Sequence, residues 1–142
     1  YVVKGSYANF GRQGLEFGQL DARWKKAVGS NWNFTVHGTS ENNSIQTSHG
    51  DDIIDGGAGD DNLKGGNGSD IFEFRGAFGA DTILDFSKGT DGLKFFDGSG
   101  YSIPFSEITA SDSSGTLLLT IDSYTVELDG INLRDWDSSF IV

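Results

Sequence analysis

Aspartate recurs at one place in successive nine-residue segments in the middle of the chain. Residues 38–46, 47–55, 56–64, 65–73 and 76–84 align in this way, after a two-residue insertion before the last segment. The sixth position of these segments holds Asn43, Asp52, Asp61, Asp70 and Asp81. Carboxylate oxygens suit calcium, which accepts about six to eight oxygens in a flexible geometry, better than magnesium, which needs a strict octahedron. The spacing therefore predicts a row of calcium sites.

Glycine occupies the positions that would shape such sites. The fourth position is glycine in the last four segments and Glu41 in the first, and glycine also fills the first two positions of segments 56–64 and 65–73. Because glycine adopts positive φ and allows close backbone approach, the first six residues are expected to form a tight loop with inward carbonyls. The loop would act as a cage for a cation.

The eighth position is a large apolar residue in every segment. The column reads Ile45, Ile54, Leu63, Phe72 and Ile83. Each predicts a strand only about three residues long that is buried on one side. Stacking the coils about 4.8 Å apart would join these residues into one narrow core and would place the aspartates above one another. Such carboxylates repel unless a cation lies between them.

Segments GGAGDDNLK and GGNGSDIFE follow the pattern Gly-Gly-x-Gly-x-Asp-x-large-x at every defined position, and this pattern resembles the RTX nonapeptide of calcium-binding parallel β-rolls. The resemblance implies that two nonapeptides form one coil, so that the first and third, second and fourth, and third and fifth segments pair around about three calcium ions. It implies carboxylate ligands from Asp52, Asp61, Asp70 and Asp81, and carbonyl ligands from Gly50, Gly57, Gly59, Gly66, Gly68 and Gly79. Asn43 carries no charge, so the outermost site is expected to be the weakest.

The predicted fold is all-β and has three parts. Residues 1–36 form an N-terminal cap or linker, residues 37–84 the parallel β-roll, and residues 85–142 an antiparallel β cap with a secretion signal. In the first part, EFGQLDARWKKAV fits one apolar helix face and fits strands almost equally well, and NWNFTV predicts a strand leading into the first repeat.

The C-terminal part contains alternating segments that predict antiparallel strands. FSEIT, TLLLTI and YTVELDGI are separated by the turn-like SDSSG and DS. GADTILDFSKGTDGLKF resembles the segment that closes β-rolls, so Asp85 and Asp91 are expected to be either structural or late calcium ligands, or turn carboxylates exposed to solvent. DWDSSFIV resembles the endings of type I secretion substrates, although Phe140, Ile141 and Val142 also fit a final edge strand.

Several classes of function are disfavoured by composition. The net charge is −11, with +3 on residues 1–36 and −14 on the remainder, which argues against nucleic-acid binding. Cysteine is absent and no apolar run reaches the length of about eighteen residues that suggests a membrane span. The two histidines form no His-Glu-x-x-His motif, and His49 is expected to be an exposed loop residue. The chain is therefore predicted to be non-enzymatic and not inserted in a membrane.

Two functions follow from these features. The first is a secreted calcium-binding module that folds outside the cell and supports type I secretion and the stability of a larger bacterial exoprotein. The alternative is an accessory module that binds an acidic polysaccharide such as alginate, as similar modules of mannuronan epimerases do. Its contacts would come from Arg12, Arg23, Lys25, Lys26, Lys64, Arg75, Lys88 and Lys94.

Overall fold

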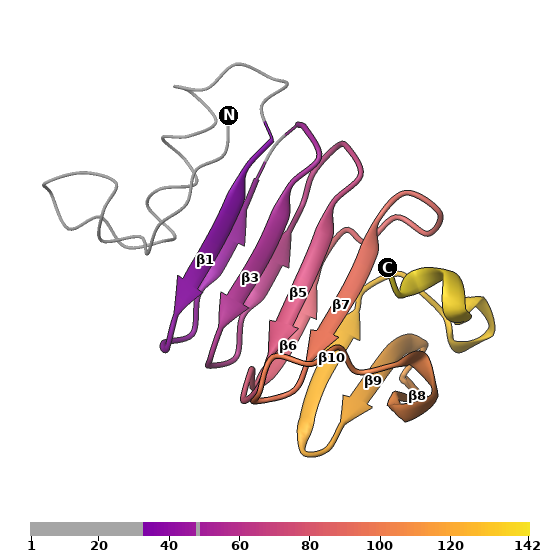
Figure 1. Ribbon diagram of the computed structural model, residues 1–142. Helices are drawn as coiled ribbons and strands as arrows, with labels where there is room; N and C mark the ends of the chain where they lie inside the picture. The colour runs from indigo at the N-terminus through magenta and orange to yellow at the C-terminus, as the bar shows by residue number, and fades with distance from the viewer. Residues whose placement is uncertain (1–32, 48) are drawn as a thin grey trace, which may run out of the picture.

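The computed structural model describes residues 33–47 and 49–142 (Figure 1). The predicted helix or strand over residues 17–28 and the basic residues from Arg12 to Lys26 lie outside this part. Within it the fold is all-β, with strands and three short 3-10 helices. The predicted β-roll with an antiparallel cap is confirmed. No helix of the described part has the length and apolarity needed to span a lipid bilayer.

The first sheet is wholly parallel and forms one wall of the roll. Its strands, in spatial order, are β1 (Thr35–Thr39), β3 (Ile53–Gly57), β5 (Ile71–Arg75) and β7 (Gly92–Phe96). Of the described residues of the strand predicted over 31–36, Thr35 and Val36 belong to β1, which continues into the first repeat. Since β1 begins before residue 37 and β7 lies beyond residue 84, the parallel sheet crosses both of the predicted domain limits, which stay predictions.

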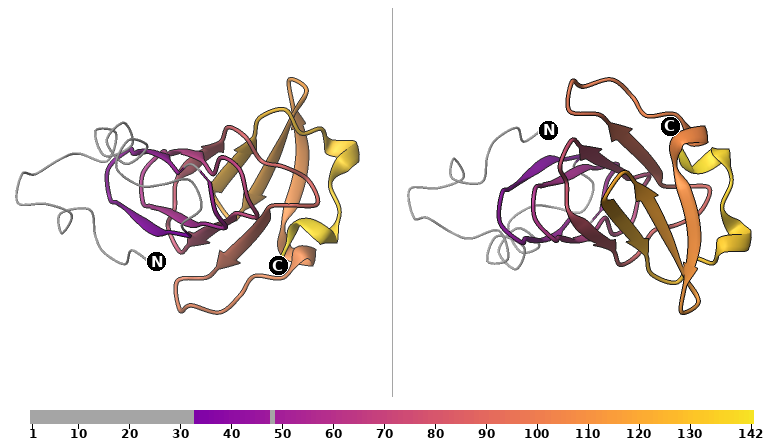
Figure 2. Two further views of the ribbon diagram at one scale, coloured as in Figure 1. Left: turned by 90° about the horizontal axis from the view of Figure 1, so that it is seen from above. Right: turned by 90° about the horizontal axis from the view of Figure 1, so that it is seen from below.

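The second sheet forms the opposite wall and continues into the cap. Its order is β2 (Ser44–Gln46), β4 (Asn62–Lys64), β6 (Ala80–Ile83), β10 (Tyr124–Leu128), β9 (Thr116–Ile121) and β8 (Thr109–Ser113). The first four are parallel neighbours, whereas β10, β9 and β8 pair antiparallel. Figure 2 shows the coils following one another from the indigo end, with the β8–β10 hairpins at the C-terminal end.

The strand register explains the nine-residue period. Ile54 lies opposite Phe72 and Ile45 opposite Leu63, so every second nonapeptide stacks and two nonapeptides make one coil. All the eighth-position side chains are at most 2% exposed and form one apolar cluster. Because side chains alternate along a strand, a slip of one residue would turn this whole column outward. Burial of the column therefore holds the loops in register.

The cap departs from the predicted strands at its first segment. Phe105–Glu107 is a 3-10 helix after Pro104, and the strand runs instead over Thr109–Ser113. Part of SDSSG is thus strand, and the turn is confined to Ser114 and Gly115, both with positive φ. Such a two-residue turn suits the twist of an antiparallel hairpin, so the polar residues before it stay extended on an exposed face.

The last residues of the described chain pack against the end of the roll. Phe140 is 1% exposed and its ring stacks on Phe86 at a centroid distance of 5.2 Å. Ile141 forms a parallel bridge with Leu93, and Val142 N donates to Leu93 O at 3.2 Å. The expected edge strand is therefore reduced to a single bridge after the 3-10 helix Ser138–Phe140.

Candidate metal centre

The loops of the roll lie in two rows, one along each edge. Ala58 N donates to Thr39 O at 3.0 Å, and Gly50 N donates to Asn67 O at 3.0 Å. A side chain on Gly79 would overlap Gly59 O. The first loop thus contacts the third, the second contacts the fourth, and the third contacts the fifth. The structure therefore brings together the same three loop pairs that the resemblance implied.

The sixth-position aspartates form two buried columns. In each residue Oδ1 accepts a hydrogen bond from a backbone N–H of the preceding coil on the same edge. The bonds run from Phe34 N to Asp52 at 2.8 Å, from Asn43 N to Asp61 at 2.7 Å, from Asp52 N to Asp70 at 2.9 Å, and from Asp61 N to Asp81 at 2.9 Å. These four side chains are at most 2% exposed. The hydrogen bonds fix each carboxylate across the gap between two loops.

The other oxygen of each carboxylate has no partner. Oδ2 of Asp52, Asp61, Asp70 and Asp81 is buried and accepts no hydrogen bond within the described part of the chain. A buried charge without compensation is strongly unfavourable, so such a group takes up a proton or a cation. Four fixed carboxylate oxygens in the paired loops are the hard donors that calcium prefers. The residues therefore fit the predicted ion.

Burial raises the pKa values of these carboxyl groups. The pKa reaches about 6 for Asp61, about 7 for Asp70 and about 8 for Asp81, mainly because of desolvation. Neighbouring carboxylates raise the pKa values further, whereas the backbone hydrogen bonds to Oδ1 lower them. Burial also raises the pKa of Asp52. In the absence of a cation, protonation competes with ionisation near neutral pH.

Glycine is required where a sixth-position carboxylate approaches the first residue of its own loop. A Cβ on Gly56 would overlap Oδ2 of Asp61, and one on Gly65 would overlap Oδ2 of Asp70. Gly59 and Gly79 have φ values of 105° and 97°, which disfavour other residues. Gly56 and Gly65 thus keep the space beside the unpaired oxygens free of side chains, whereas Gly59 and Gly79 allow the stacked loops to come close.

Backbone carbonyls are the other predicted ligands of the sites. Among residues 33–47 and 49–142 no group of three or more His, Cys, Asp or Glu side chains could hold a metal by itself. The predicted carbonyl donors at Gly50, Gly57, Gly59, Gly66 and Gly68 lie in the paired loops, as does Gly79. Their role as ligands remains a prediction.

Asn43 differs from the aspartates below it in the column. Its Oδ1 accepts from Thr39 N at 2.7 Å, and the residue is only half-buried. It therefore has a local hydrogen-bond partner and no charge to be neutralised, which supports the prediction of a weaker outer site.

A second column, at the fifth position, was missed by the sequence analysis. Asp51 Oδ1 accepts from Ser69 N at 2.8 Å and Asp60 Oδ1 accepts from Ala80 N at 3.0 Å. Asn33 and Asn42 bind the coils that follow them in the same way. The signal was the short polar residue at the fifth position of the first four segments. These side chains position the loops from their exposed side.

Asp85 and Asp91 accept backbone hydrogen bonds from the fourth segment, at the C-terminal end of one row of loops. Asp85 accepts from Gly65 N at 3.0 Å and Gly66 N at 2.9 Å. Asp91 accepts from Asp70 N at 3.0 Å and Ser87 N at 2.8 Å, so both of its oxygens have partners. Asp91 is only 7% exposed and Asp85 is half-buried, so these contacts favour a structural role over that of turn carboxylates exposed to solvent. His49 is exposed, as expected.

The family model of the RTX calcium-binding nonapeptide repeat matches residues 37–72, with four copies. Residues 37–72 are RTX repeats. Repeats of this family bind calcium. The structure is also similar to the extracellular lipase LipA of Serratia marcescens, with 25% identity and a TM-score of 0.57 over 76% of this chain. The match spans only 20% of the lipase.

A subunit of the Azotobacter vinelandii mannuronan C5-epimerase is 29% identical over 82% of this chain and 81% of the subunit, with a TM-score of 0.48. No curated protein sequence matches the chain. The RTX assignment therefore rests on the repeats at residues 37–72.

Proposed function

We propose that the chain is a calcium-dependent folding module of a larger secreted exoprotein, and that it is not itself an enzyme. The observation that carries this proposal is the set of four buried aspartate oxygens without partners, placed between stacked loops. About three ions would be held, one for each loop pair. Asp61 and Asp81 would serve one edge, Asp52 and Asp70 the other, with loop carbonyls completing each shell.

Calcium would act on the folding equilibrium. An ion that binds only the folded state stabilises it by RT ln(1 + [Ca]/Kd), about 1.4 kcal/mol at ten times Kd. Three such sites would add about 4 kcal/mol, a large part of the stability of a small domain. In low calcium the carboxylates of each column would repel and the roll would unfold. Outside the cell, calcium would shift the chain to the folded state.

Calcium dependence is testable by circular dichroism. We expect the chelated chain to lose most of its β signal and to regain it cooperatively in millimolar calcium, because the ions compensate the buried carboxylates. Magnesium at the same concentration is the control and should restore little of the signal, since its octahedral shell suits this cage poorly. A chelated chain with the full β signal would disprove the proposed switch.

The secretion signal is proposed to lie in the C-terminal segment. In the folded chain this segment is held by Phe140 in the core and by Lys88, whose Nζ donates to Asp135 O at 2.6 Å. An exporter would therefore read it in the unfolded chain, before calcium is bound. The segment would then become part of the fold.

Export of a reporter fusion through a compatible type I exporter tests this role. We expect the intact fusion to be exported and a version truncated before Asp135 to be retained. Leu119→Ala is the matched control, because it removes a fully buried side chain outside the tail and costs about 2–5 kcal/mol of stability. Export of Leu119→Ala together with retention of the truncated form would separate the signal from the fold. Equal export of the intact and truncated fusions would refute the assignment.

Two of the four described bases of the polysaccharide alternative, Arg75 and Lys88, already form ion pairs within the molecule, whereas Lys64 and Lys94 form none within the described part. Arg75 is paired with Glu73 at 2.6 Å and Asp55 at 3.5 Å, and Lys88 is paired with Asp137 at 3.2 Å. These cations are already used within the molecule. The bases at Arg12, Arg23, Lys25 and Lys26 lie outside the described part.

A further inference from the structure

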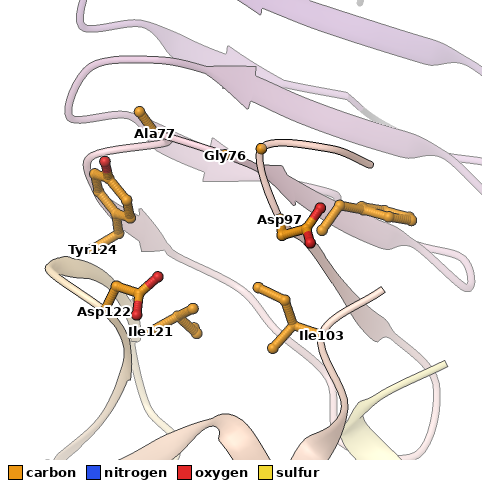
Figure 3. A pocket seen from close by; sticks show the side chains of 9 residues that line it. Gly76, Ala77, Asp97, Ile103, Ile121, Asp122 and Tyr124 are labelled. Carbon is orange, nitrogen blue, oxygen red and sulfur yellow. The ribbon is translucent and has the colours of Figure 1, made fainter. Parts of the chain in front are cut away.

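A cavity of about 270 Å³ lies in the C-terminal part of the fold, apart from the aspartate columns (Figure 3). It is bounded by the turn after β5, the segment after β7 and the β9–β10 hairpin. Ile103, Ile121 and the rings of Phe96 and Tyr124 give it an apolar lining. None of the predicted calcium ligands lines it. The cavity is therefore a candidate for a ligand other than the structural ions.

Two solvent-exposed carboxylates border this cavity from different elements. Asp97 follows β7 and Asp122 occupies the hairpin turn, and they approach the cavity from opposite sides in Figure 3. Asp97 Oδ1 accepts from Ser99 N at 2.8 Å and Tyr101 N at 2.9 Å, which fixes the carboxylate. Within the described part neither aspartate forms an ion pair, and no Lys, Arg or His lines the cavity.

One aromatic wall of the cavity already contacts a cation. The Arg75 guanidinium lies 4.0 Å from the centroid of the Phe96 ring. Arg75 is also paired with Glu73 and Asp55, so its charge is compensated on the sheet and does not neutralise Asp97 or Asp122. The second ring, of Tyr124, packs on Phe78 at a centroid distance of 5.2 Å and is held in place. The lining thus combines rigid aromatic surface with two uncompensated negative charges.

We propose that this cavity binds an alkylammonium or guanidinium group, carried either by a lysine or arginine side chain of a partner or by a free polyamine. The apolar lining would cover the aliphatic stem, the rings would contact the cation, and the carboxylates would bind its N–H groups. The net charge of −11 would raise the local concentration of such ligands. An acidic polysaccharide would be repelled at the same place.

Amide NMR titration of the calcium-saturated full chain tests the proposal. The probes are acetylated, amidated Gly-Arg-Gly and Gly-Lys-Gly, spermidine, and the neutral Gly-Gln-Gly. We expect saturable shifts at Ala77, Gly98, Asp122 and Tyr124 with a cationic probe and none with the neutral one. Binding of the tripeptides would indicate a partner side chain, whereas binding of spermidine alone would indicate a free polyamine.

Substitutions at the carboxylates sharpen the test. Asp97→Asn keeps an acceptor for Ser99 N and Tyr101 N, and Asp122→Asn keeps a residue that tolerates the positive φ of 55°. Each should weaken binding about threefold and the pair about tenfold, as expected for partly exposed ion pairs. The spectrum of each variant shows whether it is folded.

Asp112→Asn is the matched control. Asp112 is an exposed hairpin carboxylate that accepts from Gly115 N at 2.9 Å but does not line the cavity. It should leave the affinity unchanged. Equal weakening by Asp112→Asn, or shifts spread over the acidic surface without saturation at the cavity, would overturn the proposal. Displacement of the bound probe by added calcium at the same residues would also overturn it in favour of a metal site.

Discussion

Asp61→Asn is expected to weaken calcium binding at least tenfold and to remove the cooperative part of the titration. Asp61 lies in the loop that contacts both the first and the fifth segments, so its carboxylate is placed to serve two ions. The substitution preserves Oδ1 as the acceptor for Asn43 N and replaces only the unpaired Oδ2. Loss of outer-shell partners alone costs about 10–100-fold in metal affinity, so loss of a direct ligand should cost no less.

Two variants serve as controls for Asp61→Asn. Asp60→Asn removes a neighbouring charge but keeps the acceptor for Ala80 N, and Asp60 is exposed, so calcium affinity should change little. Asn43→Ala should have an intermediate effect, because it removes an uncharged residue from the outer site. Calorimetric titration gives the number of ions and their affinities. If Asp60→Asn or Asn43→Ala costs as much as Asp61→Asn, the assignment of ligands to the sixth position is wrong.

The roll was predictable because one residue type satisfies one physical need at each position. Leu63 and Phe72 could be assigned to the core from their period, and Asp61 and Asp70 to the loops, before any contact was known. The aspartate register follows from this, since a strand that buries the eighth position fixes the sixth. Despite the insertion of Phe74 and Arg75, Asp61 N donates a hydrogen bond to Oδ1 of Asp81, so the two residues stay in the same column.

The remainder of the fold depends on contacts between segments that the nine-residue period does not relate. β10 lies parallel to β6, and more than forty residues separate Ile83 from Leu128 in the chain. Parallel pairing requires a long connection of this kind, which no local sequence pattern specifies. Asp91 continues the aspartate column outside the nonapeptide spacing, so its hydrogen bond to Asp70 N could not be inferred from the repeat. The cavity between β7 and the β9–β10 hairpin likewise arises only when the two segments meet.

The charges of the aspartate columns also lead to a dependence on pH that differs between the calcium-free and calcium-bound chain. In the unfolded chain an aspartate titrates near its ordinary pKa of 3.8, whereas in the fold the pKa values are about 6 for Asp61, about 7 for Asp70 and about 8 for Asp81. Between these limits the calcium-free folded state binds more protons than the unfolded state. Its free energy of unfolding must therefore fall as the pH rises.

Mild acid should thus partly replace calcium. The contribution of these groups to calcium-free folding is complete below the unfolded pKa of 3.8 and is lost as the pH rises through the folded values from about 6 to about 8. We expect the chelated chain to show more β signal and a higher urea midpoint near pH 5 than near pH 8, roughly as linkage requires. Calcium affinity should rise from pH 5 to pH 8, because protons and calcium compete for the same oxygens. Asp81→Asn removes the group with the highest of these pKa values and should flatten the upper part of the calcium-free profile, whereas Asp112→Asn, an exposed carboxylate outside the columns, should not. If the urea midpoint of the chelated chain instead rises from pH 5 to pH 8, the carboxylates of the calcium-free fold must be either solvated or compensated.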